Sequence, residues 1–143
     1  MTVPLESGTL AVVRAVFGAL DDLDAFRALL AEDAALVVGA TGRTVEGADA
    51  VVAAVSVTFD LIPDLRVTTT TAFASGAWGV AEVVREGTHL GPVPLPDGTA
   101  SPPTGEAVRL PECVVFEVRG GLVQTMRVWA DEADTARQLG LSR

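Results

Sequence analysis

The chain is organised around one stretch, Glu86-Gly87-Thr88-His89-Leu90-Gly91-Pro92, which runs on to Pro102-Pro103-Thr104-Gly105. An apolar strand is predicted before it, over residues 80–85. Residues 91–104 hold five of the eight prolines and show no periodicity, which predicts a loop. Two alternating segments follow and predict strands. Because it joins strands, we expect this loop to cover any bound ligand as a lid.

Length and composition predict one globular domain. The chain has 143 residues, of which 49% are hydrophobic, so residues 1–143 suffice for a single domain with one core. The net charge of −9 argues against a nucleic-acid partner, because such binding depends on clustered Lys and Arg. We expect no membrane partner, since no apolar run reaches the length of a membrane helix, and we recognise no signal peptide.

The single cysteine and the single histidine limit the chemistry further. Cys113 excludes an internal disulfide bond and favours a cytoplasmic protein. It lies in an apolar strand, which predicts a buried, inert thiol. One histidine without other ligands at a suitable spacing predicts no metal site, and we expect no cofactor.

Helices and two short strands are predicted in the first half of the chain. Apolar residues at helical spacing predict helices over residues 9–20, 23–30 and 48–60. Short strands are expected over residues 34–38 and 43–46. Ser7 or Thr9 can cap the first helix, Asp22 can cap the second, and Pro63 ends the segment of the third.

The second half alternates with a period of two. This pattern predicts a four-stranded antiparallel meander over residues 65–74, 77–90, 107–118 and 122–131. Glycine turns at Ser75-Gly76 and Arg119-Gly120-Gly121 join neighbouring strands. A final helix is expected over residues 132–139, with Gly140 at its C-cap. The fold class is therefore α+β, in which a curved sheet can wrap around the helices and leave a cavity.

Short sequence words occur in the same order as in a known family. They are Asp22-Leu23-Asp24-Ala25-Phe26 before Leu29-Leu30-Ala31-Glu32-Asp33, Val45-Glu46-Gly47, Ile62-Pro63-Asp64-Leu65-Arg66-Val67, Gly87-Thr88-His89-Leu90-Gly91, Pro102-Pro103-Thr104-Gly105, Val115-Phe116-Glu117-Val118-Arg119-Gly120-Gly121 and Gln138-Leu139-Gly140-Leu141. Over nearly its whole length, the chain resembles the SnoaL-like polyketide cyclases of the nuclear-transport-factor-2-like superfamily. The resemblance implies a cone-shaped α+β barrel, in which a strongly curved antiparallel sheet wraps around N-terminal helices.

The chain departs from this family at the acid–base positions. The aldol-type cyclases resemble one another in a His before the last hairpin and an Asp after it, and these places fall on Val114 and Val128. The Asp of the related epoxide hydrolases also falls on Val128, and the base of the related ketosteroid isomerases falls near Val38. Valine cannot move a proton, so the enolate chemistry of the family dyad is not expected.

Two polar residues are the candidates for catalysis. The resemblance to the epoxide hydrolases places Glu82 and Val84 toward the cavity, where desolvation would raise the pKa of Glu82 and let it donate a hydrogen bond. The alternative is a solvated or salt-bridged glutamate at a sheet edge. His89 is the second candidate, and its alternative role is to fix the start of the loop by a hydrogen bond.

Apolar residues are expected to line the cavity and bind the substrate. They are Phe17, Val38, Phe59, Val84, Val114, Phe116, Met126 and Val128. The alternative is a closed core without any cavity, since such residues also fill cores. Trp129 should point to the opposite, convex face, where it is a candidate for a homodimer interface.

These observations favour an enzyme of natural-product (antibiotic) biosynthesis. It would be an intramolecular cyclase that folds an apolar polyketide or polyene, by a cycloaddition of the Diels–Alder type rather than an aldol step. One alternative is a domain that only binds a small molecule or dimerises. The other is an epoxide hydrolase or isomerase with relocated carboxylates such as Glu82, Glu86 or Glu112.

Overall fold

The computed structural model describes residues 8–141 as one α+β fold. The helices are α1 (Gly8–Gly18), α2 (Leu23–Ala28), α3 (Ala48–Leu61) and α4 (Glu132–Gln138). The strands are β1 (Leu30–Val38), β2 (Arg43–Glu46), β3 (Arg66–Ser75), β4 (Trp78–Thr88), β5 (Val93–Pro94), β6 (Ala100–Ser101), β7 (Ala107–Arg119) and β8 (Leu122–Ala130). This α+β class is the one that the sequence predicted.

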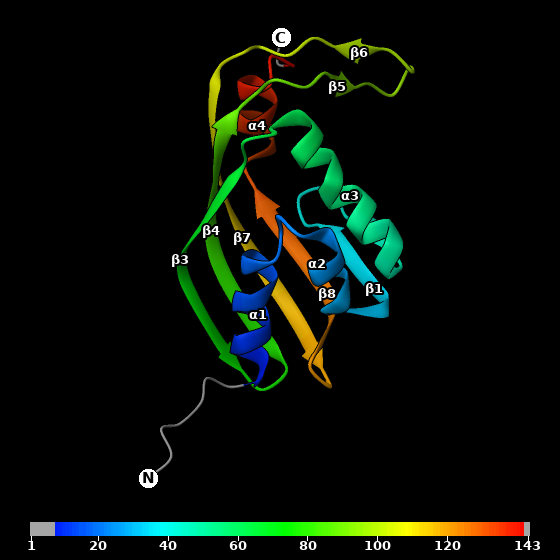
Figure 1. The fold of residues 1–143 in the computed structure, drawn as a ribbon, viewed down its shortest axis with the longest axis vertical. Helices are drawn as coiled ribbons and strands as arrows, with labels where there is room; N and C mark the ends of the chain where they lie inside the picture. Colours follow the sequence, from blue (N-terminus) through cyan, green and yellow to red (C-terminus); the bar gives the residue numbers. More distant parts are fainter. Residues whose placement is uncertain (1–7, 142–143) are drawn as a thin grey trace.

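Six strands form one curved sheet in the order β2-β1-β8-β7-β4-β3. The predicted meander is confirmed, since β3, β4, β7 and β8 are antiparallel neighbours. β1 runs parallel to β8, so the sheet is mixed rather than purely antiparallel. The cone is also open, because β2 and β3 are free edges. Figure 1 shows α1, α2 and α3 on the same side of the sheet, inside its curve.

Local chemistry explains the element boundaries. The Asp22 side chain accepts a hydrogen bond from the Ala25 backbone and caps α2, as predicted. Gly120 and Gly121 both have positive φ and form the two-residue turn between β7 and β8. The Thr9 hydroxyl donates to the Gly76 carbonyl and so joins α1 to the β3–β4 turn, while Ser7 lies outside the described residues.

β1 begins four residues earlier than the sequence pattern indicated. The sequence pattern places Leu30 in the second helix, but it pairs with Val123 of β8 and is buried in the core together with Ala31. The backbone N–H of Val123 also donates to the Leu29 carbonyl. Pairing with β8 and burial therefore end α2 at Ala28, a tertiary effect that overrides local helical spacing.

Two of the sequence words meet in space at the end of α3. The Asp64 carboxylate accepts hydrogen bonds from the backbone N–H and the hydroxyl of Thr88, at 2.7 and 2.9 Å. These bonds lower the pKa of Asp64. A Cβ at Gly91 would overlap the Asp60 carbonyl oxygen, and one at Gly87 would overlap Ile62. Both glycines are therefore required by close packing.

The proline-rich loop is held to the body of the molecule at both ends. Its short strands β5 and β6 pair as a small hairpin, which Figure 1 shows at the end of the molecule beyond α3 and α4. Beneath it, Val93 joins a second hydrophobic cluster with Ile62, Val108, Leu110 and Leu139. The sequence predicted neither the hairpin nor this separate cluster.

The convex face of the sheet carries exposed aromatic side chains. Phe73, Trp78 and Trp129 are 56%, 49% and 47% exposed, and the indole of Trp129 lies across Gly39. The prediction that Trp129 points to the convex face is confirmed. Cys113 lies on the same face and is half-buried rather than buried; burial, together with the Glu82 carboxylate, raises the pKa of its thiol.

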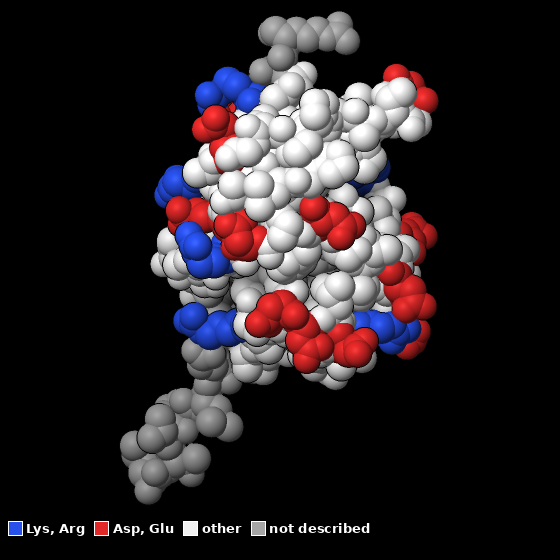
Figure 2. All heavy atoms as spheres, turned by 45° about the horizontal axis from the view of Figure 1, so that its top comes forward, with Lys and Arg blue, Asp and Glu red and all other residues white. Residues whose placement is uncertain are grey.

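On the face shown in Figure 2, the few basic side chains stand among acidic ones and form no continuous patch. Within residues 8–141, no helix is long and apolar enough to cross a membrane.

Candidate functional site

A pocket of about 280 Å³ lies between the concave face of the sheet and α3. It is mostly apolar. The sheet contributes Leu36, Val38, Val114, Met126, Val128 and Ala130, the helices contribute Phe17, Ala54, Val55 and Phe59, and the turn between α1 and α2 contributes Leu20. Its size is close to the lower end, about 300 Å³, of the range for small-molecule sites. The alternative of a closed core is therefore not what the structure contains.

The three valines at the family's acid–base positions form one row across the sheet. Val38 on β1 pairs with Val128 on β8, and Val128 pairs with Val114 on β7. All three line the pocket. The positions onto which the resemblance places an acid or a base therefore face the cavity, and in this chain they form an apolar wall.

Six of the eight expected wall residues line the pocket, and the other two, Phe116 and Val84, do not. The six are Phe17, Val38, Phe59, Val114, Met126 and Val128. Phe116 is fully buried behind the wall, where its ring meets that of Phe17 edge to face with centroids 5.8 Å apart. Phe116 supports Phe17 rather than bounding the cavity.

The expectation that Glu82 and Val84 face the cavity is wrong. Ala81 and Val83 are buried against the core, and side chains alternate between the two faces of a strand, so Glu82 and Val84 lie on the convex face. Both border a shallow hollow there, beside Cys113 and Trp129. The exposed Glu82 matches the solvated alternative.

His89 is fully buried but does not line the pocket. Its Nδ1 accepts a hydrogen bond from the backbone N–H of Thr104 at 3.2 Å, and its own backbone bonds to Glu106 and Gly105. The structural role is therefore confirmed: His89 ties the start of the loop to its end. As Nδ1 is an acceptor, the ring proton is on Nε2, which has no hydrogen-bond partner among the described residues.

The lid expectation is also wrong for this pocket. None of residues 91–104 lines it. The loop packs instead on the end of α3, where the N–H groups of Leu90 and Gly91 both donate to the Leu61 carbonyl at 3.0 Å. The pocket is bounded near α4 by Glu132 and Thr135.

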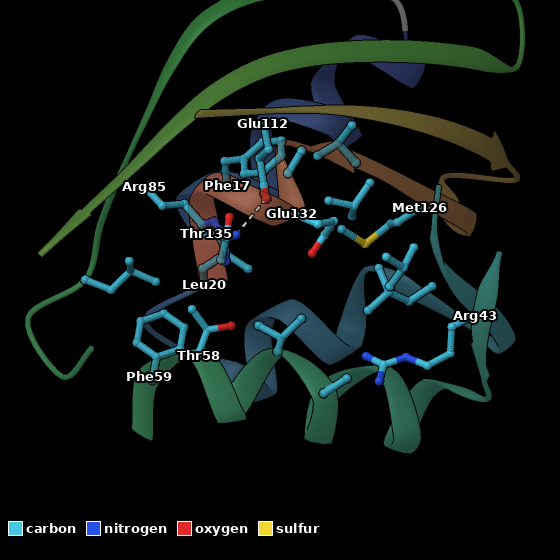
Figure 3. Close-up of a pocket in the computed structure, with 18 residues that line it drawn as sticks. Phe17, Leu20, Arg43, Thr58, Phe59, Arg85, Glu112, Met126, Glu132 and Thr135 are labelled. Atoms are coloured by element: carbon cyan, nitrogen blue, oxygen red, sulfur yellow. Dashed lines mark ion pairs between the residues drawn. The ribbon is translucent and has the colours of Figure 1, made fainter. Parts of the chain in front are cut away.

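One side of the pocket carries an ion pair whose carboxylate is buried. The Arg85 guanidinium and the Glu112 carboxylate are 2.8 Å apart, and the Glu112 side chain is only 8% exposed. Figure 3 shows the pair next to Thr135 of α4, with Phe59 and Thr58 of α3 across the cavity. The Arg85 Nε–H has no partner in the described part of the chain. Glu112 is thus the only carboxylate buried in the wall of this pocket, among residues 8–141.

Opposing influences act on the Glu112 carboxyl. Burial raises its pKa most strongly, and the nearby Glu132 carboxylate raises it further, while Arg85 lowers it. The net direction is upward, because the desolvation of a charge by the valine wall exceeds the attraction of one arginine. Glu112 can therefore serve as a hydrogen-bond donor or a proton carrier closer to neutral pH than an exposed glutamate.

Sequence reasoning named Glu112 only among alternatives and did not place Arg85, Arg43 or Glu132 in the pocket, although all three line it. A signal for Glu112 was present, because it lies two residues before Val114 and period-two alternation places both on one face. By the same alternation, Arg85 shares the inward face of β4 with the buried Val83. Glu132 is positioned by a cap that the sequence pattern does not reveal: the Asp131 side chain accepts from the Asp134 backbone at the start of α4.

No group of three metal-ligating side chains occurs within residues 8–141. The polar groups that line the otherwise apolar pocket are the Arg85–Glu112 pair, the exposed side chains of Arg43 and Glu132, and the hydroxyls of Thr58 and Thr135.

Comparison with known proteins identifies the family. The family model of the SnoaL-like polyketide cyclases matches residues 10–139. No curated protein sequence is significantly similar to this chain.

Solved structures share the fold at low sequence identity. A protein from Jannaschia sp. CCS1, provisionally named a SnoaL-like polyketide cyclase, is 22% identical with a TM-score of 0.83, covering 100% of this chain and 99% of its own. A provisionally named polyketide cyclase from Xanthomonas campestris is 23% identical (TM-score 0.76; coverage 94% and 98%). IdmH from Streptomyces antibioticus, also provisionally named a polyketide cyclase, is 22% identical (TM-score 0.72; coverage 91% and 96%).

Proposed function

Because the chain belongs to the SnoaL-like polyketide cyclase family, we propose that it is an intramolecular cyclase that folds an apolar, polyene-type substrate in the pocket. The family and its neighbours support a cyclase or isomerase type of function. The proposal includes a place in natural-product (antibiotic) biosynthesis and, from the single cysteine, in the cytoplasm.

The observation that carries the proposal is the valine row with one buried carboxyl beside it. Val114 and Glu112 stand on the same face of β7, so an apolar substrate that lies along the valines brings one polar group against Glu112. A conjugated carbonyl is a suitable group, since the protonated form of Glu112 can donate a hydrogen bond to its oxygen.

Orientation supplies the main part of the catalysis in this proposal. In a cycloaddition of the Diels–Alder type, two new carbon–carbon σ bonds form from π bonds, and no proton, atom or electron enters or leaves. The free substrate rarely adopts the conformation in which the diene lies against its partner, and the pocket holds it in that conformation. Well-aligned partners reach effective molarities on the order of 10⁵ M. A hydrogen bond from Glu112 to the carbonyl adds to this effect by drawing electron density from the reacting double bond.

A second candidate is an isomerase or epoxide hydrolase in which Glu112 moves a proton. The raised pKa of Glu112 and the proximity of Glu132 favour it, because paired carboxyl groups with different environments can act as acid and base. Glu82 and Glu86, the other relocated carboxylates considered, belong to the convex face set by the alternation of β4 and do not line the pocket.

The substitution Glu112→Gln separates the two candidates. Glutamine keeps an acceptor for Arg85 and a donor for the substrate but cannot transfer a proton. The wild-type protein should convert a synthetic linear polyene with a conjugated ketone to a ring product of unchanged mass. The reaction is monitored by chromatography and by the loss of polyene absorbance. In the cyclase, Glu112→Gln should lower the rate by no more than about tenfold, whereas loss of general acid–base catalysis costs about 10²- to 10⁴-fold.

Glu82→Gln is the matched control, because it removes a carboxyl from the convex face and should leave the rate unchanged. A large loss with Glu112→Gln would favour the isomerase or hydrolase. If no member of a series of polyene chain lengths is converted, although the pocket binds them, the protein is a small-molecule-binding domain and the cyclase proposal fails.

A further inference from the structure

The pocket has a second arginine, Arg43, at the end opposite the ion pair. Arg43 is the first residue of β2 and pairs with Val38 of β1, so it continues the row of Val38, Val128 and Val114 to the edge of the sheet. Figure 3 shows its side chain reaching inward over α3, on the far side of Met126 from Arg85 and Glu112. Arg43 is exposed, and it lines the pocket.

The two arginines of the pocket differ in their partners. Arg85 is neutralised by Glu112 at 2.8 Å. Arg43 has no carboxylate within ion-pair distance anywhere in residues 8–141, although the chain is strongly acidic. Its acidic neighbour Glu46 is three residues further along β2 and therefore stands on the other face of the strand.

Two carboxylates of the flanking elements α3 and β1 are engaged by another arginine. Arg27 binds Asp49 of α3 at 2.6 Å and Glu32 of β1 at 3.4 Å. The Arg43 guanidinium thus presents its planar, forked donors to the pocket with nothing bound to them among the described residues, and this fork fits the two oxygens of a carboxylate.

From this arrangement, we infer that the substrate is an amphipathic acid whose carboxylate is held by Arg43 at the mouth of the pocket. This inference rests on the proposed function and specifies its substrate class: a linear polyene carboxylic acid rather than an ester or a hydrocarbon. We place the carboxylate at Arg43 rather than at the other end of the pocket, because Arg85 there is already bonded to Glu112 and the Glu132 carboxylate would repel a second anion.

The geometry also sets the direction in which the substrate lies. β2 and β7 are three steps apart in the sheet, which is about 14 Å of sheet between Arg43 and the strand of Glu112. The chain of the substrate spans this distance along the valines. Its reacting carbonyl therefore meets Glu112 at a fixed number of bonds from the carboxylate.

Binding of a fluorescent linear tetraene fatty acid and of its methyl ester tests this inference. The wild-type protein should bind the acid about three- to tenfold more tightly than the ester, as expected for an ion pair that is partly exposed to solvent. Arg43→Gln should reduce the affinity for the acid to that for the ester and leave the ester unchanged. Arg43→Lys, which keeps the charge without the fork, should restore part of the preference.

The control is Arg127→Gln, which removes an arginine from the convex face and should change neither affinity. Equal binding of acid and ester by the wild-type protein, or an acid preference that survives in Arg43→Gln, would overturn the role of Arg43 and leave the cyclase proposal standing. If neither ligand binds the wild-type protein, both the inference and the apolar substrate site are wrong. Circular dichroism of each variant verifies that the fold is retained.

Discussion

At the scale of single residues, the pocket is defined by the contrast between Val114 and Glu112. They are neighbours on one face of β7, yet one gives the wall its apolar character and the other introduces a carboxyl that is 8% exposed. The Arg85 partner keeps this carboxyl from being an isolated buried charge, which would be very unfavourable. The net effect of the surroundings still raises the pKa of Glu112.

This raised pKa predicts a pH dependence of stability. The folded protein holds the Glu112 proton more tightly than the unfolded chain does, so the contribution of Glu112 to the free energy of unfolding is complete below the ordinary pKa of 4.5. It declines as the pH rises from that value through the raised pKa of the folded state. Urea unfolding between pH 4 and 8 should show the wild-type stability falling relative to that of Glu112→Gln.

Glu82→Gln serves as a surface control in the same titration. A wild-type stability that instead rises with pH relative to that of Glu112→Gln would mean that the attraction of Arg85 exceeds the cost of burial, so that the pKa of Glu112 is lowered rather than raised.

At the scale of elements, the sequence predicted the strands and helices well and one strand face wrongly. Alternation located β4, but the choice of face depended on a family alignment that put Glu82 and Val84 inward. Ala81 and Val83 are buried, so their face of β4 points inward and the face of Glu82 and Val84 points outward. Such a choice depends on which face packs against the helices, and the alternation of β4 alone does not contain that information.

The proline-rich loop shows a second limit of sequence reasoning. Its local pattern indicated a loop correctly, but its position depends on long-range contacts: Asp64 with Thr88, Gly91 against Asp60, and His89 with Thr104. These contacts attach the loop to the end of α3, so that it does not cover the pocket. That Val38, Val114 and Val128 line the cavity could be predicted from the resemblance, whereas the pairing of β1 with β8 that sets them in one row could not.

At the scale of the whole molecule, the concave face encloses the pocket and the convex face carries exposed aromatic side chains. Exposed apolar surface of this kind on a sheet is typical of an interaction site. We propose that the convex face around Trp129 forms a homodimer, as the sequence suggested. The pocket lies on the other side of the sheet and would stay open in such a dimer.

The substitution Trp129→Arg tests this assembly. An arginine in place of a central interface tryptophan should convert the dimer to a monomer in sedimentation velocity runs over a range of protein concentrations. Leu90→Arg is the control, since Leu90 is similarly exposed, at 55%, but lies on the loop rather than on the sheet. A wild-type protein that remains monomeric at every concentration would contradict the dimer and leave the pocket proposal unaffected.

The central claim is that ring closure takes place against the valine wall. The most direct measurement compares the conversion of a linear polyene ketone by the wild-type protein, by Val128→Phe and by Val84→Phe. Val128→Phe adds a ring to the wall and should abolish most of the conversion, whereas Val84→Phe adds the same ring to the convex face and should leave it unchanged. Full conversion by Val128→Phe, or equal losses in both variants, would contradict the account.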